Sequence, residues 1–115
     1  MKLFDSTTAT LERSLDVRLE RQNLLAGNVA NANTPGYAPK DVNFEQAMAA
    51  AESNGGNGAS IDNFIETHDA TPGIDGNKVD ADHALVMLAQ NAIQYGASAK
   101  AIGKKLEILK SVADA

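Results

Sequence analysis

The amino-acid sequence predicts an all-α protein in which long N- and C-terminal helices pack as a coiled-coil hairpin, joined by a largely irregular acidic loop region. Apolar residues recur at helical spacing near both ends, over residues 5–33 and 81–113. The segment between them, residues 34–80, is rich in turn-forming and acidic residues. A length of 115 residues suits one domain rather than two, so residues 1–115 are expected to form a single domain.

The apolar residues of this chain are mostly small. Hydrophobic residues make up 43% of the sequence, but 20 residues are alanine and only 25 are Leu, Ile, Val or Phe. Alanine favours helices but buries little surface. We therefore expect elongated helices that need a partner surface and an isolated monomer that is largely disordered or marginally stable, and a pocketed enzyme is disfavoured.

Charge and cysteine content narrow the function classes further. The net charge of −5 argues against a nucleic-acid partner, which needs a basic face. Nine acidic groups and one basic group, Lys78, lie in residues 41–82. The absence of cysteine excludes disulfide and thiolate chemistry. The sequence also predicts no cleaved signal peptide and no membrane span, because no apolar run is long enough for either.

The N-terminal helix is predicted from one apolar stripe, which the polar residues Arg18 and Gln22 interrupt. Its proposed packing residues are Leu11, Leu15, Leu25 and Val29. The helix should end before Pro35, because proline disfavours a helical conformation in the residue that precedes it. Pro35 and Gly36 suit the central positions of a type II turn, after which Tyr37 can pack back on the helix.

The middle of the chain carries weaker signals. A short helix is expected over residues 44–52 and a short extended segment over residues 61–67. A glycine-rich flexible loop is expected over residues 53–58. The remainder of residues 34–80 is predicted to be irregular, because Pro72-Gly73 and Asp75-Gly76 mark further turns.

The C-terminal helix is predicted from a heptad pattern in which apolar residues alternate spacings of three and four. Asp80 or Asp82 is expected to cap its start. A second apolar edge, which includes Val86 and Ile93, predicts contact with more than one neighbour. The proposed packing residues are Leu85, Leu88, Ala92, Tyr95, Ala99, Ile102, Leu106 and Leu109.

No residue pattern indicates catalysis, a metal or a cofactor. His68 lies in an acidic loop and His83 in the first helical turn, where a solvated or packed role is the ordinary one. Residues 75–82 fail the EF-hand spacing, since Val79 falls at a ligand position and Asp80 where glycine is needed. We therefore expect no catalytic, metal-binding or cofactor-binding residues.

The string Asn28-Val29-Ala30-Asn31-Ala32-Asn33-Thr34-Pro35-Gly36-Tyr37 resembles the N-terminal signature of the bacterial flagellar rod and hook (axial) proteins. Residues 19–28 and 40–44 look most like the proximal-rod members of that family, and residues 75–80 with Asn91 and Tyr95 agree. The residues that carry the signature turn are Asn28, Asn31, Asn33, Thr34, Pro35, Gly36 and Tyr37.

The resemblance implies a structural subunit of the flagellar basal-body rod, formed by one axial-protein domain. It implies type III export without a cleaved signal. The implied partners are other rod subunits, export-gate and MS-ring junction proteins, and copies of itself in a helical assembly. Residues 1–10 are expected to add a contact with the export gate. The alternatives are another rod subunit, or a soluble helical adaptor or secretion chaperone.

Overall fold

The computed structural model describes residues 6–53, 60–69, 71–73 and 76–114. They form an elongated molecule whose principal axes measure 64, 26 and 14 Å. Most of the predicted glycine-rich loop, Asp75 of the excluded calcium motif and residues 1–5 of the expected export-gate contact lie outside the described residues.

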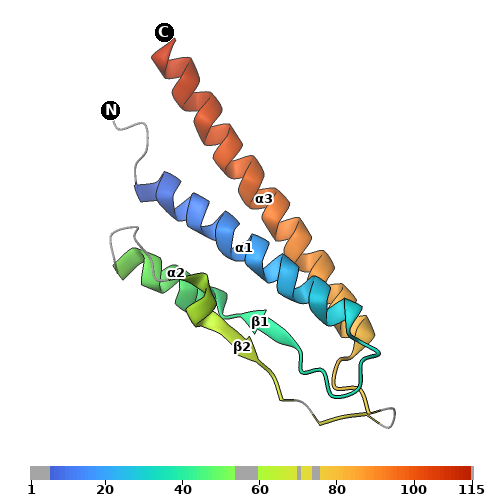
Figure 1. Cartoon of the computed structure of the whole chain (residues 1–115). Coiled ribbons are helices and arrows are strands. Elements are labelled where there is room, and N and C mark those ends of the chain that lie inside the picture. Colours follow the sequence, from blue (N-terminus) through green and yellow to red (C-terminus); the bar gives the residue numbers. More distant parts are fainter. Residues whose placement is uncertain (1–5, 54–59, 70, 74–75, 115) are drawn as a thin grey trace.

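Two long helices form the body of the molecule, as predicted. Helix α1 (Ser6–Ala30) and helix α3 (Ala81–Ala113) lie side by side and run in opposite directions (Figure 1). Asp80 is the N-cap of α3, and its Oδ1 accepts from the backbone N–H groups of Asp82 and His83 at 3.1 and 3.2 Å. The C-terminal end of α3 projects beyond the start of α1. Coiled-coil geometry between the two helices stays a prediction.

The connecting region contains regular structure, so the all-α prediction is incomplete. Strands β1 (Lys40–Val42) and β2 (Ile65–Thr67) pair in antiparallel register, with Val42 opposite Ile65. Between them lie helix α2 (Phe44–Ser53) and the 3₁₀ helix η1 (Ile61–Phe64). The short helix was predicted. The extended segment expected over residues 61–67 is confirmed for Ile65–Thr67 and wrong for Ile61–Phe64, which form η1. The strand at Lys40–Val42 and its pairing with β2 were not predicted, because three-residue strands are too short to show an alternating pattern.

Asn43 connects the sheet to α2. Its backbone N–H donates to the Phe64 carbonyl at 2.8 Å, and its side-chain Oδ1 accepts from the Gln46 N–H at 3.1 Å. The second bond satisfies a free N–H at the start of α2, which is the role of an N-cap. One asparagine therefore both continues the strand pairing and starts the helix.

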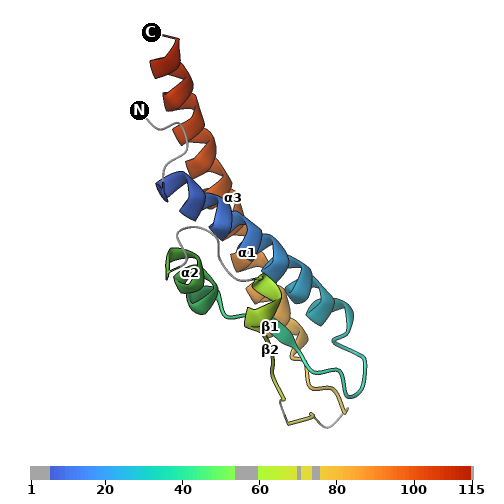
Figure 2. The ribbon, with the colours of Figure 1, turned by 60° about the vertical axis from the view of Figure 1, so that its left-hand side comes forward.

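A small core lies on the side of α1 that faces away from α3. It centres on three buried residues, Val17, Val42 and Ala47. Partly buried side chains pack around it: Leu24, Phe44, Met48, Ile61, Phe64 and Ile65. Helix α1 thus packs against α3 and also against α2 and β1, and Figure 2 shows α2 and the strands beside α1.

Candidate assembly interface

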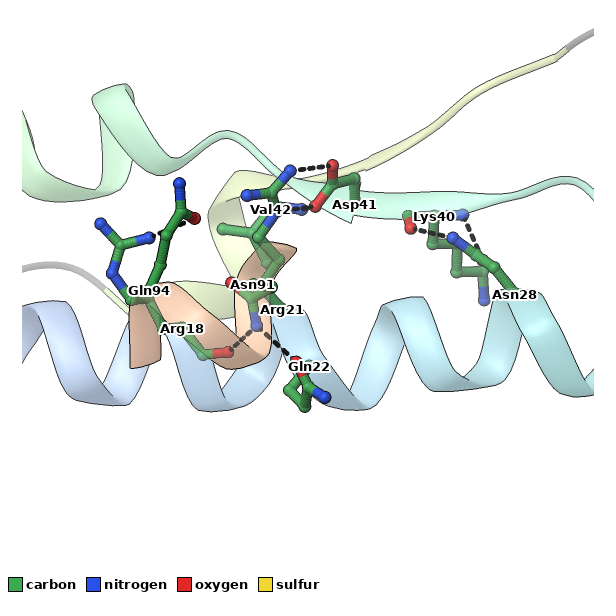
Figure 3. Close-up of polar contacts among 9 residues, drawn as sticks. All are labelled: Arg18, Arg21, Gln22, Asn28, Lys40, Asp41, Val42, Asn91 and Gln94. Atoms are coloured by element: carbon green, nitrogen blue, oxygen red, sulfur yellow. Dashed lines mark hydrogen bonds and ion pairs between the residues drawn. The ribbon is translucent and has the colours of Figure 1, made fainter. Parts of the chain in front are cut away.

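The signature turn begins with a buried asparagine. Asn28 lies in the last turns of α1 and is 5% exposed. Its Nδ2 donates to the Lys40 carbonyl at 2.8 Å, and the Lys40 N–H donates to its Oδ1 at 2.9 Å (Figure 3). The amide therefore pairs with both backbone groups of the first residue of β1. This pairing fixes the end of α1 against the start of the sheet.

The rest of the signature closes the helix and reverses the chain. Asn31 bonds back to the Gly27 carbonyl through its backbone N–H at 3.0 Å and its Nδ2 at 2.8 Å. The Tyr37 N–H donates to the Thr34 carbonyl at 3.2 Å, and Gly36 has φ of 80°. These values are those of the predicted type II turn. Asn33, Thr34, Pro35 and Gly36 are exposed.

The seam between α1 and α3 is built around a fully buried polar residue, Asn91. Its Nδ2 donates to the Arg18 carbonyl and to Gln22 Oε1, both at 2.8 Å (Figure 3). A buried polar residue in a helix seam favours the one register in which its partners lie opposite. Arg18 and Gln22, which interrupt the apolar stripe of α1, supply those partners.

Arg18 connects three elements. Its Nη1 donates to Gln94 Oε1 of α3 at 2.9 Å, while its guanidinium lies 4.2 Å from the centre of the Phe44 ring at the start of α2. A cation over an aromatic face is attracted by the ring quadrupole. Partial burial, with a smaller effect of the charge on Arg21, lowers the pKa of Arg18 from its ordinary value. The group stays a cation and contacts both layers beside α1.

Arg21 attaches the sheet to the next turn of α1. Its Nε and Nη2 donate to the two carboxylate oxygens of Asp41 at 2.8 and 3.1 Å, and both side chains are mostly buried. Paired parallel bonds of this kind fix orientation as well as distance. Arg18, Arg21 and Asn28 of α1 thus each hold a neighbouring element against this helix through polar contacts.

The structure divides the predicted packing residues into two groups. On α1, Leu25 is buried, and Leu11, Leu15 and Val29 are half-buried. On α3, five residues are half-buried: Leu88, Tyr95, Ala99, Ile102 and Leu109. The remaining three, Leu85, Ala92 and Leu106, are exposed.

The offset has a simple geometric origin. The buried residues of α3 are Ala84 and Asn91, each one position before the predicted Leu85 and Ala92. One residue turns the helix by about 100°. The face toward α1 is therefore centred beside the predicted seam, and three of the eight predicted packing residues of α3 are exposed.

A second face of α3 carries large apolar side chains that the described part of the chain leaves exposed. Ile93 is 73% exposed, and Val86, Ile108 and Val112 are about half exposed. Among the described elements, α3 packs chiefly against α1. Large exposed apolar patches mark interaction sites in soluble proteins.

The His, Asp and Glu side chains of the described residues do not form a metal-binding group. Among them, no three His, Cys, Asp or Glu side chains are grouped so that they could hold a metal ion. Within the same part of the chain, no helix is long and apolar enough to cross a membrane. His68 and His83 are among the residues that line a cavity at the start of α3, together with apolar side chains such as Val79 and Met87.

Sequence reasoning missed three seam residues, Arg18, Gln22 and Asn91, because it searched for apolar positions. A signal was present, since residues 11, 15, 18, 22, 25 and 29 keep the alternating spacing of four and three. Polar residues at such positions indicate a partner of matching polarity on the facing helix. The fully buried Val17 was also missed, because it faces the sheet layer.

Comparison with known proteins gives consistent matches. Residues 11–37 match the family described as "Flagella basal body rod protein". The chain is 31% identical to "Flagellar basal body rod protein FlgB" of Aeromonas hydrophila, covering 95% of this chain and 94% of the relative. The FlgB protein of Bacillus subtilis is 30% identical, with coverage of 97% and 96%. That of Escherichia coli is 27% identical, with coverage of 94% and 93%.

Proposed function

The chain belongs to the flagellar basal body rod protein family, on the FlgB branch, and from this premise we propose that it assembles through its two terminal helices. It is a structural subunit of the proximal rod of the flagellar basal body, not an enzyme. It works with other basal-body components and contributes to motility.

The observation that carries the proposed mode of assembly is the two-sided character of α3. One side packs against α1 around Asn91, and another side exposes Val86, Ile93, Ile108 and Val112. In water, covering these side chains yields roughly 25 cal/mol for each Å² of apolar surface removed. Neighbouring subunits in a tube would supply that cover.

The finer partners follow from the family resemblance. We infer that the chain leaves the cell by type III export without a cleaved signal peptide. Its neighbours in the rod are then copies of itself, the following rod subunits, and the export-gate and MS-ring junction proteins. The exposed Pro35-Gly36 turn lies at the opposite end of α1 from Ser6 and from the end of α3, so the two ends of the subunit offer different contacts.

Purification of basal bodies tests this function directly. The chain should copurify with intact basal bodies from the bacterium that encodes it, and deletion of its gene should abolish both basal bodies and swimming. A soluble adaptor or secretion chaperone would instead remain in the cytoplasmic fraction. Swimming that survives the deletion would overturn the proposal.

Crosslinking separates this subunit from another rod subunit. A cysteine at position 93 should link to neighbours at the base of the rod, because Ile93 is the most exposed large apolar side chain among the described residues. The matched control is a cysteine at Ala49 on the exposed side of α2. Linkage only to hook-proximal subunits would favour a distal position in the rod.

A further inference from the structure

The two edges of the small sheet differ in how their backbone groups are satisfied. On the β1 edge, the N–H and C=O groups of Lys40 bond to the Asn28 amide, and the Val42 N–H donates to Asp41 Oδ1 at 2.7 Å. Strand β1 packs on α1 and pairs with β2, so β2 is the outer strand (Figure 1). The chain therefore closes the β1 edge with its own side chains.

The ladder between the strands determines which groups of β2 point outward. The Asn43 N–H donates to the Phe64 carbonyl, and the His68 N–H donates to the Pro39 carbonyl, both at 2.8 Å. Bonded and non-bonded pairs alternate along an antiparallel ladder. The residue before His68 therefore belongs to a non-bonded pair, and the N–H and C=O groups of Thr67 point away from β1.

Three backbone groups of β2 are available to a further strand: the N–H and C=O of Thr67 and the C=O of Ile65, which lies two residues earlier on the same edge. The Ile65 N–H already donates to the Asp62 carbonyl in η1. Within the described residues, no hydrogen bond engages the other three groups. An exposed edge of this kind is a template for pairing with another extended chain.

The middle of the sheet carries an excess of negative charge on one face. Asp41 and Glu66 lie opposite each other in the ladder and therefore on the same face. Arg21 binds the Asp41 carboxylate, whereas Glu66 Oε1 accepts from the neutral amide of Asn43 at 3.1 Å. Lys40 is adjacent to Asp41 in the strand, so its side chain points to the other face. Two carboxylates thus share one guanidinium, and a cation on a strand beside Glu66 would balance them.

A second copy of β2 is a poor partner for this edge. Antiparallel pairing centred on Glu66 places two like charges directly opposite each other, which is destabilising. Pairing centred on Thr67 places Ile65 opposite the carboxylate of Asp69. The edge instead suits a strand with a basic residue beside Glu66 and an apolar residue beside Ile65, which packs on the small core.

We propose that the outer edge of β2 binds an extended basic segment of a different protein, which adds a third strand to the sheet. The segment bonds to the backbone groups of Thr67 and to the Ile65 carbonyl, and its lysine or arginine lies beside Glu66. A sheet of three strands with one apolar face is more stable than a two-stranded one. The contact lies outside both the seam between α1 and α3 and the exposed side of α3, so it goes beyond the proposed function.

Titration of the full-length chain with synthetic peptides tests this edge. The probe peptide alternates threonine and valine around a central lysine, and its matched control has glutamate in place of the lysine. The lysine peptide should slow hydrogen exchange of the Thr67 amide, measured by NMR. It should also bind about three-fold more tightly than the glutamate peptide, as expected for one cross-strand charge pair. Equal binding of the two peptides, or unchanged exchange at Thr67, would overturn the proposal.

A charge reversal tests the assigned partner of the lysine. Glu66→Lys should reverse the preference, so that the glutamate peptide binds more tightly. Glu107→Lys makes the same change of charge on the distal part of α3 and should leave the preference as it is (Figure 1). A preference for the lysine peptide that survives Glu66→Lys would show that Glu66 does not select the strand.

A proline tests the backbone pairing. Thr67→Pro removes the outward N–H but keeps the ladder bonds to β1, because proline is tolerated where the N–H points to solvent. It should weaken binding of the lysine peptide by about five-fold, the value of one hydrogen bond, whereas Thr67→Val should not. Equal affinities of the two variants would contradict strand addition. Glu66→Lys, at an exposed position, still decides the question if Thr67→Pro fails to fold.

Swimming assays separate this inference from the rod function. Cells that carry Thr67→Pro should swim less well than cells that carry Thr67→Val, because the partner segment loses part of its binding site. Equal swimming would overturn the claim that a partner uses this edge, while the rod function stands. Absence of the parent chain from purified basal bodies would instead overturn the rod function, and the peptide titrations do not depend on it.

Discussion

Asn28 and Lys40 are joined like residues of paired strands: the Asn28 amide donates to the Lys40 carbonyl at 2.8 Å and accepts from the Lys40 N–H at 2.9 Å. The side chain thus takes the place of a neighbouring strand for the first residue of β1. Twelve residues separate the two partners, so the bond pair closes the whole signature turn as a loop. The signature therefore ends α1 and also attaches it to the sheet through the hydrogen bonds between Asn28 and Lys40.

Asn28→Ala should lower the free energy of unfolding by about 1–3 kcal/mol, because two backbone groups lose their partner. Urea unfolding followed by circular dichroism measures the change. Asn33→Ala is the matched control, since Asn33 is exposed in the same turn and its loss should cost less than about 0.5 kcal/mol. Equal stability of the two variants would contradict the fastening role of Asn28.

Asn91→Ala should also destabilise the chain by about 1–3 kcal/mol, because the Arg18 carbonyl and Gln22 Oε1 lose a buried donor. Gln90→Ala, at an exposed position one residue earlier, is the control. Crosslinks between cysteines placed on α1 and α3 should in addition become less selective in register. If the crosslinks keep the same register in Asn91→Ala, Asn91 does not specify the register between α1 and α3.

Two glycines should respond in opposite directions to alanine. Gly36→Ala should destabilise the chain by about 1–2 kcal/mol, because Gly36 has φ of 80°, which L side chains rarely adopt. Gly103→Ala should stabilise the monomer by about 1 kcal/mol, because the position is helical and nothing lies within 4 Å of an added Cβ. Thermal melts of the two variants measure both effects. A destabilised Gly103→Ala monomer would contradict the open space seen at this helix face.

Substitution of exposed apolar residues should separate folding from assembly. Leu106→Asp and Ile93→Asp should abolish swimming while the monomer melts within a few degrees of the parent chain, because both side chains are exposed in it. Ile102→Asp should block assembly as well, but it should also lower monomer stability because Ile102 is half-buried. Gln90→Glu adds the same charge at an exposed polar position and serves as the control. Normal swimming in the two aspartate variants would rule out these residues as assembly contacts.

Asp69 should titrate below its ordinary range. Its hydrogen bond with Lys78, and next the charge of that lysine, lower the pKa of Asp69 from 3.8. The pair therefore favours the folded state fully above the pKa of the unfolded chain, and the effect is lost as pH falls through the lowered value. NMR titration of the Asp69 carboxyl should show an upward shift of its pKa in Lys78→Met. An unmoved titration would mean that the ion pair does not form in solution.

The long helices could be predicted from the sequence because each repeats its pattern over many turns. Leu88, Tyr95, Ile102 and Leu109 recur every seven residues, and all four are half-buried in the structure. The intervening heptad positions were harder to assign. Leu85 is apolar and exposed, whereas its neighbour Ala84 is buried, and hydrophobicity alone does not distinguish a covered seam from one that awaits a partner.

The sheet and the polar anchors depend on contacts between residues far apart in the chain. Val42 pairs with Ile65, 23 residues later in the chain, and Arg21 binds Asp41, 20 residues later. Neither contact can be predicted from the residues next to it in sequence, because strands of three residues are too short to show an alternating pattern. The turn at Pro35-Gly36, by contrast, was predictable because its geometry depends on adjacent residues alone.

The thinnest axis of the molecule, at 14 Å, has a consequence for protein engineering. In so thin a molecule almost no side chain is buried on both sides. Most substitutions therefore affect both the stability of the isolated chain and its contacts with partners. Screening variants of the isolated chain for solubility or protease resistance would reward polar replacements at Val86 and Ile93. The same replacements would be selected against in a swimming cell. Optimising the free subunit and preserving the working organelle are therefore opposing goals along this side of α3.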